Sequence, residues 1–142
     1  MAAAEDDVSR LRMILLRLAR RLRQQVNSGI TPSQLSALVT IAKRGPLTLG
    51  ELAAIENVQP PTISRIVGAL EGEGWVERTS NERDRRISLV RATPAARREL
   101  EQIREERNTW LANRLATLST GDRNHLLAAL PALEQLLDEE TP

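Results

Sequence analysis

The stretch TLGELAAIENVQPPTISRIVGALEGE, residues 48–73, decides the fold of this 142-residue chain. Thr48 is a residue type that caps helices, and a short helix is expected to follow it. A tight turn comes next, in which Asn57 tolerates a left-handed backbone. Pro60 then suits the first turn of a second helix, which is expected to end near Glu73. The stretch therefore predicts two helices joined by a tight turn.

The side chains of these helices divide into a packed face and a polar face. Ala53 is small enough to let the helices approach closely, and the apolar residues expected to fix their angle are Leu52, Val58, Ile63 and Ile66. Polar residues remain at the start of the second helix, where a helix-turn-helix reads bases. Arginine reads guanine, glutamine reads adenine, and threonine or serine contacts phosphates or a thymine methyl. The predicted recognition residues are Gln59, Pro61, Thr62, Ser64 and Arg65, the alternative being a packed helix pair with a bland polar face.

An arginine-rich loop follows this helix pair. Residues 75–79 and 87–92 are expected to form two short strands, and between them Arg83, Arg85 and Arg86 surround Asp84. A β-hairpin with a basic tip in this place is a wing, whose arginines suit narrow A·T minor grooves. Asp84 is expected to orient one neighbouring arginine by an ion pair. A solvated charged turn is the alternative, but the wing together with the helix-turn-helix predicts binding to double-stranded DNA.

The remaining segments are predicted to be helices with apolar seams. Residues 7–26 carry leucines at heptad-like spacing, and residues 31–34 form a capping box for the next helix. A helix over residues 93–118 would span roughly 37 Å, too long for one small core to cover. Arg107 interrupts its apolar stripe, and Pro131 is expected to kink the last helix. The helix caps predicted along the chain are Thr31, Thr48, Thr93 and Ser119. The predicted fold class is mainly α with a small β-hairpin wing.

Composition excludes several classes of protein. The chain has 20 Lys+Arg against 19 Asp+Glu, so its net charge of +1 says little about a polyanionic partner. All basic residues except Lys43 are arginine, which reflects either phosphate binding or a GC-rich genome. There is no cysteine and only one histidine, His125, so thiol chemistry, a metal site and a cofactor are not expected. No nucleophile–base pair can be nominated, and an enzyme is not expected.

Other composition features narrow the partners and the location. Trp75 and Trp110 are the only aromatic residues, which disfavours a binder of single-stranded nucleic acid. No apolar stretch approaches the ~20 residues of a membrane span. The N-terminus, MAAAEDD, lacks the pattern of a signal peptide. A cytoplasmic protein without a membrane partner is expected.

Three motifs resemble the multiple-antibiotic-resistance regulator (MarR) family, and the resemblance covers nearly the whole chain. They are QPPTISRIV at 59–67, LEGEGWVER at 70–78 and RDRR at 83–86, with LGELA at 49–53 upstream. The family implies a homodimer of winged-helix subunits, usually a repressor, that binds a pseudo-palindrome. Many members release DNA when a small phenolic or lipophilic effector binds. Carried over by position, Thr62, Ser64 and Arg65 match major-groove contacts, Arg85 and Arg86 match wing contacts, and Asp84 organises the wing.

The resemblance also implies a division of the chain. Residues 1–142 would form a single domain, with a winged helix-turn-helix at about 31–92 and dimerisation helices at about 7–27 and 94–138. A ligand cavity would lie where these parts meet, with Leu15, Leu18, Leu38 and Trp110 as candidate lining residues. For those four residues, ordinary core packing is the favoured alternative. The family's usual Leu-Thr and later Gly are replaced here by Ala92-Thr93 and Ala96, so packing at that joint is expected to differ.

The main competing hypothesis is a winged-helix adaptor that binds another protein and no DNA. The crowding of Arg83, Arg85 and Arg86 at one loop argues against it, because an adaptor has little use for such a tip. Within the family, the absence of cysteine excludes the branch of thiol-oxidation sensors, and the single histidine argues against the zinc-responsive branch.

Overall fold

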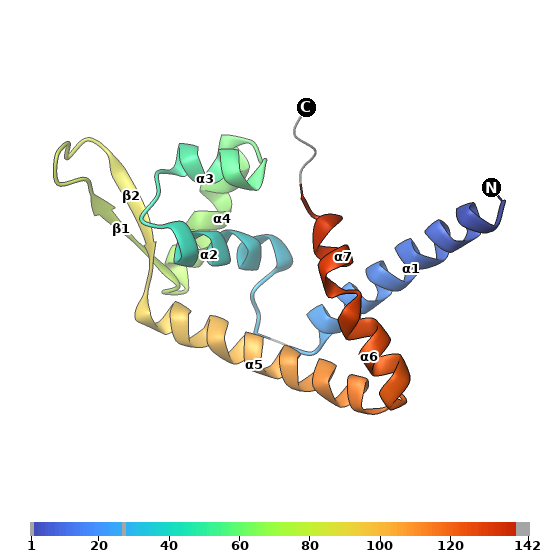
Figure 1. Ribbon diagram of the computed structural model, residues 1–142. Coiled ribbons are helices and arrows are strands. Elements are labelled where there is room, and N and C mark those ends of the chain that lie inside the picture. The colour runs from blue at the N-terminus through green and yellow to red at the C-terminus, as the bar shows by residue number, and fades with distance from the viewer. Residues whose placement is uncertain (1, 27, 139–142) are drawn as a thin grey trace.

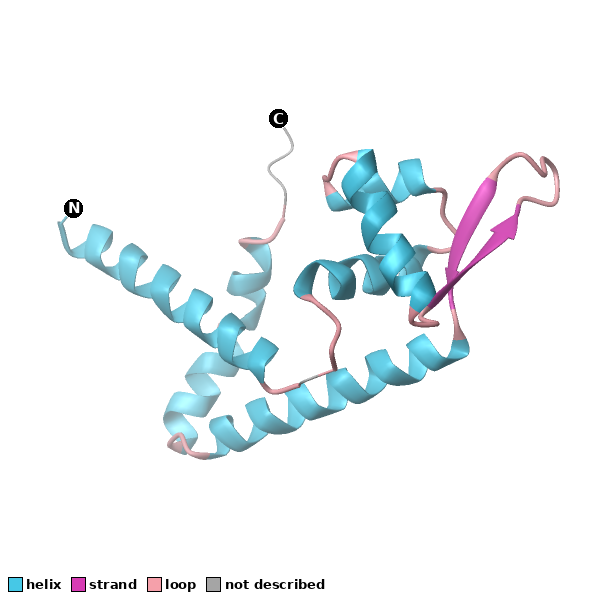
Figure 2. Ribbon diagram, turned by 180° about the vertical axis from the view of Figure 1, so that it is seen from behind, coloured by secondary structure: helices cyan, strands magenta, loops and turns pink. Residues whose placement is uncertain are grey.

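The computed structural model describes residues 2–26 and 28–138, and these contain seven helices and one two-stranded antiparallel sheet (Figure 1). In chain order the elements are α1 (Ala2–Gln24), α2 (Pro32–Arg44), α3 (Leu49–Glu56), α4 (Pro60–Gly72), β1 (Val76–Ser80), β2 (Ser88–Ala92), α5 (Pro94–Ala116), α6 (Thr120–Ala128) and α7 (Leu130–Gln135). The predicted fold class is confirmed (Figure 2). Residues 1, 27 and 139–142, which the predicted domain ranges include, lie outside the described residues.

All four predicted helix caps are confirmed. Thr31 forms a full capping box, since its Oγ1 accepts the Gln34 N–H at 3.2 Å while its own N–H donates to Gln34 Oε1 at 3.1 Å. The hydroxyls of Thr48, Thr93 and Ser119 each accept a backbone N–H three residues further on, at 3.1–3.2 Å. These side chains satisfy backbone donors that the first helical turn leaves without a partner.

The turn between α3 and α4 has the left-handed residue expected of it. Asn57 has φ 53° and ψ 48°, a conformation that asparagine tolerates better than most residues. Beside the turn, the Glu56 carboxylate accepts hydrogen bonds from Ser36 Oγ at 2.8 Å and Thr40 Oγ1 at 2.6 Å. Both hydroxyls belong to α2, so these bonds fix the end of α3 against it.

The core lies between α2, α3, α4 and the hairpin. Its fully buried side chains are Leu38, Ile41, Leu52, Ile63, Val67, Leu70 and Val90. Burying one such side chain stabilises the fold by about 1.5–3 kcal/mol. The buried stripe of α4 consists of Ile63, Val67 and Leu70, which confirms the packing role predicted for Ile63, while Ile66 is half-buried. Ala53 is also buried, as close approach of α3 and α4 requires.

The hairpin begins one residue later than predicted at each strand. Trp75 belongs instead to the turn that ends α4, because its N–H donates to the Leu70 carbonyl at 2.9 Å. Gly74 makes this turn with φ +80°, a conformation that favours glycine. Val90 of β2 also exchanges two backbone hydrogen bonds with Leu47, at 3.0 and 2.7 Å, which ties the hairpin to the segment before α3.

The joint between β2 and α5 accommodates the departure from the family pattern. Thr93 Oγ1 accepts the Ala96 N–H and donates to the Gly74 carbonyl at 2.8 Å. Ala96 is 0% exposed, and Ala92 is buried as well. The small side chains at both positions therefore pack in the core without disturbing the cap.

Helices α1, α6, α7 and the second half of α5 extend away from this core (Figure 1). Three predicted boundaries are corrected here: α1 begins at Ala2 instead of Asp7, α5 ends at Ala116 instead of about Leu118, and the last helix is broken instead of kinked. The break comes between α6 and α7, where Pro131 occupies the first turn of α7. Proline removes a helical N–H and clashes with the preceding turn, but it is tolerated at a helix start.

Candidate nucleic-acid interface

The first part of the interface is the N-terminal turn of α4. Gln59 occupies the cap position, and its side chain makes no capping hydrogen bond. Pro61, Ser64 and Arg65 are exposed, and Thr62 is half-buried. The buried stripe of α4 faces the core, so the polar residues face outward as the sequence predicts. The turn thus presents an amide, two hydroxyls and a guanidinium.

The second part is the hairpin tip, which is an ordered turn. Asn81 Oδ1 accepts the backbone N–H of Arg83 at 2.8 Å and that of Asp84 at 3.3 Å. The backbone of Ile87 then closes the loop, donating to the Asp84 carbonyl at 3.1 Å and accepting the Asn81 N–H at 2.9 Å. This organising role of Asn81 was not among the predictions from the sequence. The signal for it was an asparagine at the start of a polar turn, where its side chain commonly bonds backbone two residues on.

Asp84 holds Arg86 in a two-point ion pair. Its Oδ1 accepts Arg86 Nε at 3.0 Å, and its Oδ2 accepts Arg86 Nη2 at 3.1 Å. The Arg86 backbone N–H also donates to Asp84 Oδ1 at 3.0 Å. The Arg86 side chain, followed by its backbone N–H, holds the pKa of Asp84 below its ordinary value, and Asp84 raises the pKa of Arg86. This clasp orients the Arg86 side chain while 91% of it stays exposed.

Other arginines of the hairpin are engaged away from the tip. Arg78 Nε lies 3.1 Å from Glu71 Oε2, and Arg91 Nε lies 2.7 Å from Glu77 Oε1. Arg83 and Arg85, by contrast, are exposed and have no ion-pair partner in the part of the chain that the structure describes. The free positive charge of the hairpin is therefore concentrated at its tip.

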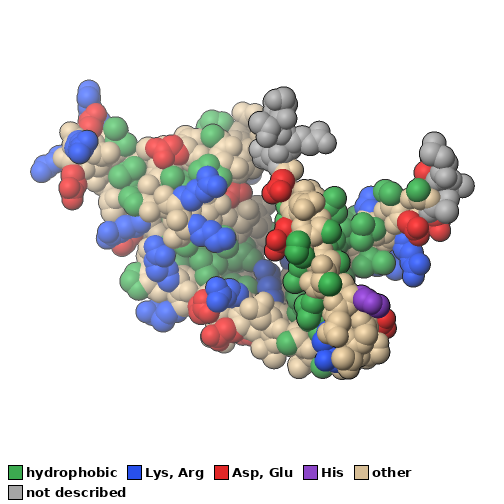
Figure 3. All heavy atoms as spheres, viewed as in Figure 1, with side chains coloured by type: hydrophobic (Ala, Val, Ile, Leu, Met, Phe, Trp, Pro, Cys, Tyr) green, Lys and Arg blue, Asp and Glu red, His purple; other side chains and the backbone are tan. Residues whose placement is uncertain are grey.

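The two parts of the interface lie on the same side of the molecule. The start of α4 and the hairpin tip both point away from α5 in the two ribbon views (Figures 1 and 2). A space-filling view shows Lys and Arg side chains over the hairpin tip and on the face of the winged part (Figure 3). The start of α4 is therefore placed to enter a major groove of DNA, and the basic tip of the hairpin beside it is placed to enter the adjacent minor groove.

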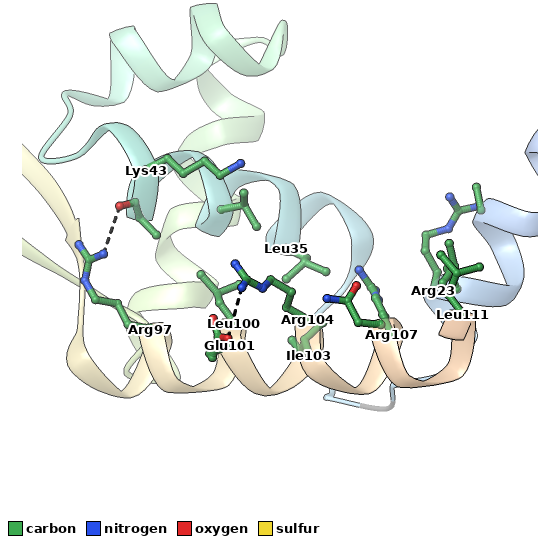
Figure 4. Close-up of a pocket in the computed structure, with 15 residues that line it drawn as sticks. Arg23, Leu35, Lys43, Arg97, Leu100, Glu101, Ile103, Arg104, Arg107 and Leu111 are labelled. Carbon is green, nitrogen blue, oxygen red and sulfur yellow. Dashed lines mark hydrogen bonds and ion pairs between the residues drawn. The ribbon is translucent and has the colours of Figure 1, made fainter. Parts of the chain in front are cut away.

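A separate crevice of about 880 Å³ opens between α1, α2 and α5 (Figure 4). Its larger apolar lining residues are Leu22, Leu35, Val39, Leu100, Ile103 and Leu111. None of the four residues predicted to line a cavity is among its lining residues. Leu38 is 0% exposed in the core, Trp110 is half-buried, and Leu15 and Leu18 are exposed on α1. On α2 the crevice is lined by Leu35, Val39 and Ala42, whereas Leu38 is fully buried in the core.

Two further observations concern other classes of site. Residues 2–26 and 28–138 contain no cluster of three or more histidine or acidic side chains able to hold a metal ion. Over the same residues, no helix combines the length and the apolar character needed to cross a membrane.

Comparison with known proteins is consistent with this geometry. The MarR family model matches residues 30–88. An uncharacterised HTH-type transcriptional regulator of Mycobacterium bovis, Mb0904, is 38% identical over 132 residues, which are 92% of this chain and 92% of that protein. The multiple antibiotic resistance protein MarR of Salmonella typhimurium is 30% identical over 113 residues, 80% of this chain and 74% of that protein. A solved MarR family protein from Bacillus stearothermophilus superimposes with a TM-score of 0.80 at 28% identity, covering 96% of each chain. The chain therefore belongs to the MarR family of winged helix-turn-helix transcriptional regulators.

Proposed function

We propose that two copies of this chain bind a pseudo-palindromic operator in double-stranded DNA, repress transcription there, and are released by a small molecule. The observation that carries the proposal is the clasped, basic hairpin tip on the same side as the exposed start of α4. A cytoplasmic location follows from this role.

The start of α4 would read bases in the major groove. Arg65 is long enough to reach a guanine edge, and Gln59 offers both a donor and an acceptor to adenine. Thr62 and Ser64 carry short hydroxyls suited to phosphate oxygens or a thymine methyl. Pro61 fixes the backbone of the first turn of α4 and has no backbone N–H group.

The hairpin tip would contact the adjacent minor groove and its phosphates. Arg86 enters pre-oriented by Asp84, so less side-chain entropy is lost when it binds. Arg85 and Arg83 are free to neutralise phosphates, because neither has an acidic partner among the described residues.

The helices outside the winged part would form the homodimer. Large apolar side chains are exposed on α1, on α6 and on α7, where Val8 is 67%, Leu126 43% and Leu130 46% exposed. Hydrophobic side chains gather along α6 and α7 and along α1 (Figure 3). Exposed apolar surface on this scale marks an interface. The dimer interface would be formed by helices at about 7–27 and 94–138, and the winged part of each copy would lie at about 31–92. This arrangement would place the two α4 helices one DNA turn apart, roughly 34–36 Å.

Ligand release is supported by the position of the crevice. Its walls come from α1 and α5 of the dimerisation part and from α2 of the winged part. A ligand there that binds one arrangement of these parts more tightly shifts the population toward that arrangement. If the favoured spacing of the α4 helices does not match the operator, DNA is released.

Selection of duplexes from a random library tests the proposal. The wild-type chain is compared with an Arg85→Ala, Arg86→Ala variant and with an Arg78→Ala, Arg91→Ala control, which loses the same charge from strand positions away from the tip. We expect the wild type and the control to enrich a two-fold symmetric motif that the tip variant does not enrich. If the folded wild type enriches no duplex, the winged-helix adaptor becomes the better account.

A further inference from the structure

Gly68 of α4 differs from the other glycines of the chain. All seven glycines lie in the described residues, and the other six stand in turns or loops, at a helix cap, or within two residues of a helix end. Gly68 is a full turn or more from both ends of its helix, Pro60 and Gly72. Glycine is less favourable in a helix interior than any residue except proline. The helix itself therefore gains nothing from a glycine at this position.

Packing within the chain does not require this glycine either. Gly68 is exposed, and a Cβ added to it would meet no other atom within 4 Å. Gly45 is the contrasting case, because an added Cβ there would collide with the Ile41 carbonyl. No described residue of this chain occupies the space over Gly68, so that space is open to a partner.

The open space lies over the face of α4 that carries the predicted recognition residues. Pro61 and Ser64 precede Gly68 by seven and four residues, which are two turns and one turn of a helix, and all three are exposed. Arg65 is exposed beside them, three residues before Gly68. The start of α4 points away from α5 (Figures 1 and 2), so DNA read by these residues would lie beyond the first turn of the helix.

The dimensions of DNA would then place Gly68 at the mouth of the groove. Gly68 comes seven residues after Pro61, roughly 10 Å along the helix. A major groove is about 8.5 Å deep and about 12 Å wide. When the first turn of α4 reaches the base edges, the turn that contains Gly68 is level with the sugar–phosphate strands that border the groove. A residue without a side chain lets such a strand approach the helix backbone closely.

We propose that a sugar–phosphate strand of the operator packs against α4 at Gly68, and that the missing side chain sets how deeply the recognition residues enter the groove. Gly68 is thus a positioning residue, which reads no base but controls the distance of Ser64 and Arg65 from the base edges. The inference rests on the proposed function, since it requires double-stranded DNA at the start of α4. Filling the space over Gly68 should stabilise the fold and weaken DNA binding together, whereas a purely structural glycine would show no such opposition.

Gly68→Ala and Gly68→Leu test the inference. Both new residues are strong helix formers and neither changes the net charge, so each variant should raise Tm by about 2–4 °C. Fluorescence anisotropy then measures affinity for a duplex selected by the wild type. We expect a severalfold loss for Gly68→Ala and a loss of about tenfold or more for Gly68→Leu, because the larger side chain overfills a close contact further.

Gly72→Ala and Gly72→Leu are the matched controls. Gly72 is also exposed and has open space around it, but it comes eleven residues after Pro61, roughly 16 Å along the helix and outside the groove. Both control variants should keep the affinity of the wild type. Sedimentation of each variant should show the same oligomeric state as the wild type.

Four results would overturn the inference. They are wild-type affinity in a folded Gly68→Leu chain, an equal loss in Gly72→Leu, a lower Tm for Gly68→Ala, and a Gly68→Leu chain that changes its oligomeric state. The third would show that the fold needs the glycine, and the fourth would assign Gly68 to an interface between copies. A wild-type chain that binds no duplex refutes the proposed function and this inference with it. A wild-type chain that binds a duplex no better than Gly68→Leu does refutes this inference alone.

Discussion

Replacing Arg85 with alanine should make DNA binding less sensitive to salt. Arg85 is exposed at the hairpin tip and has no ion-pair partner in the described chain, so a phosphate is the partner available to it. Each phosphate neutralised by a protein contributes about 0.9 to the slope of log affinity against log salt. With one such contact per wing and two wings per dimer, the slope should become shallower by about 1.8.

That change in slope has a measurable consequence for affinity. Between 50 and 200 mM salt, a slope difference of about 1.8 changes the ratio of wild-type to variant affinity by roughly tenfold. Fluorescence anisotropy of a labelled operator, titrated at several salt concentrations, measures both affinities. The loss caused by Arg85→Ala should be largest at low salt and should shrink as salt rises.

Arg91→Ala is the matched control for this experiment. It removes the same charge from the same hairpin, but Arg91 Nε already lies 2.7 Å from Glu77 Oε1. Its salt slope should stay close to that of the wild type. Parallel slopes for the wild type and Arg85→Ala would refute the assignment of the tip. An equal change in both variants would show that net charge, and not the position of the arginine, sets the slope.

Further predictions concern stability and titration. Asn57→Ala places alanine at φ 53° and should lower the free energy of unfolding by about 1 kcal/mol, whereas Asn57→Gly should be nearly neutral; chemical denaturation compares them. Thr93→Ala removes the α5 cap and the bond to Gly74, and should cost about 1–2 kcal/mol in the same assay; an unchanged midpoint would contradict the cap. Leu52→Ala, at a fully buried core position, should cost about 2–5 kcal/mol. Because Arg86 lowers the pKa of Asp84, the clasp should be complete above the ordinary value of 3.8 and be lost as pH falls through the lowered value. A carboxyl-carbon NMR titration should therefore give Asp84 a midpoint below 3.8, which Arg86→Ala returns toward 3.8.

The features that were predictable from the sequence depend on neighbours along the chain. Thr31, Thr48, Thr93 and Ser119 cap helices through residues three positions away, and Asn57 adopts its conformation within a single turn. Such local chemistry can be read from a short window. Most of the buried stripe of α4 was predictable for the same reason, since helical spacing alone places its residues on one face.

The crevice was not predictable in this way because it depends on how α1, α2 and α5 pack. Leu38 and Leu35 are both apolar residues of α2, yet Leu38 faces the core and Leu35 faces α5. Spacing along α2 does not decide which of its apolar residues meets α5. The one local signal was Arg107, an arginine within an apolar stripe. Its significance depends on burial, which only the packed structure gives.

The sequence also did not predict that the last helix would be divided in two near Pro131, since only a kink was expected there. A proline inside a helix predicts either a kink or a break of that helix. The proline alone does not decide between them, because they differ in whether the helix continues beyond it. Here α6 ends at Ala128 and α7 starts at Leu130. The apolar residues of α6 and α7 are consequently divided between two short helices, both of which expose leucines.

Hydroxyl-radical footprinting on a selected duplex tests the central claim most directly. A two-fold symmetric dimer should protect two symmetric half-sites, with centres about 10–10.5 base pairs apart, or a multiple of that distance. Each half-site should be flanked by a minor-groove protection that the Arg85→Ala, Arg86→Ala variant loses and the Arg78→Ala, Arg91→Ala control keeps. A single asymmetric footprint, or flanking protections that persist in the tip variant, would contradict a two-fold symmetric dimer whose hairpin tips contact the minor groove.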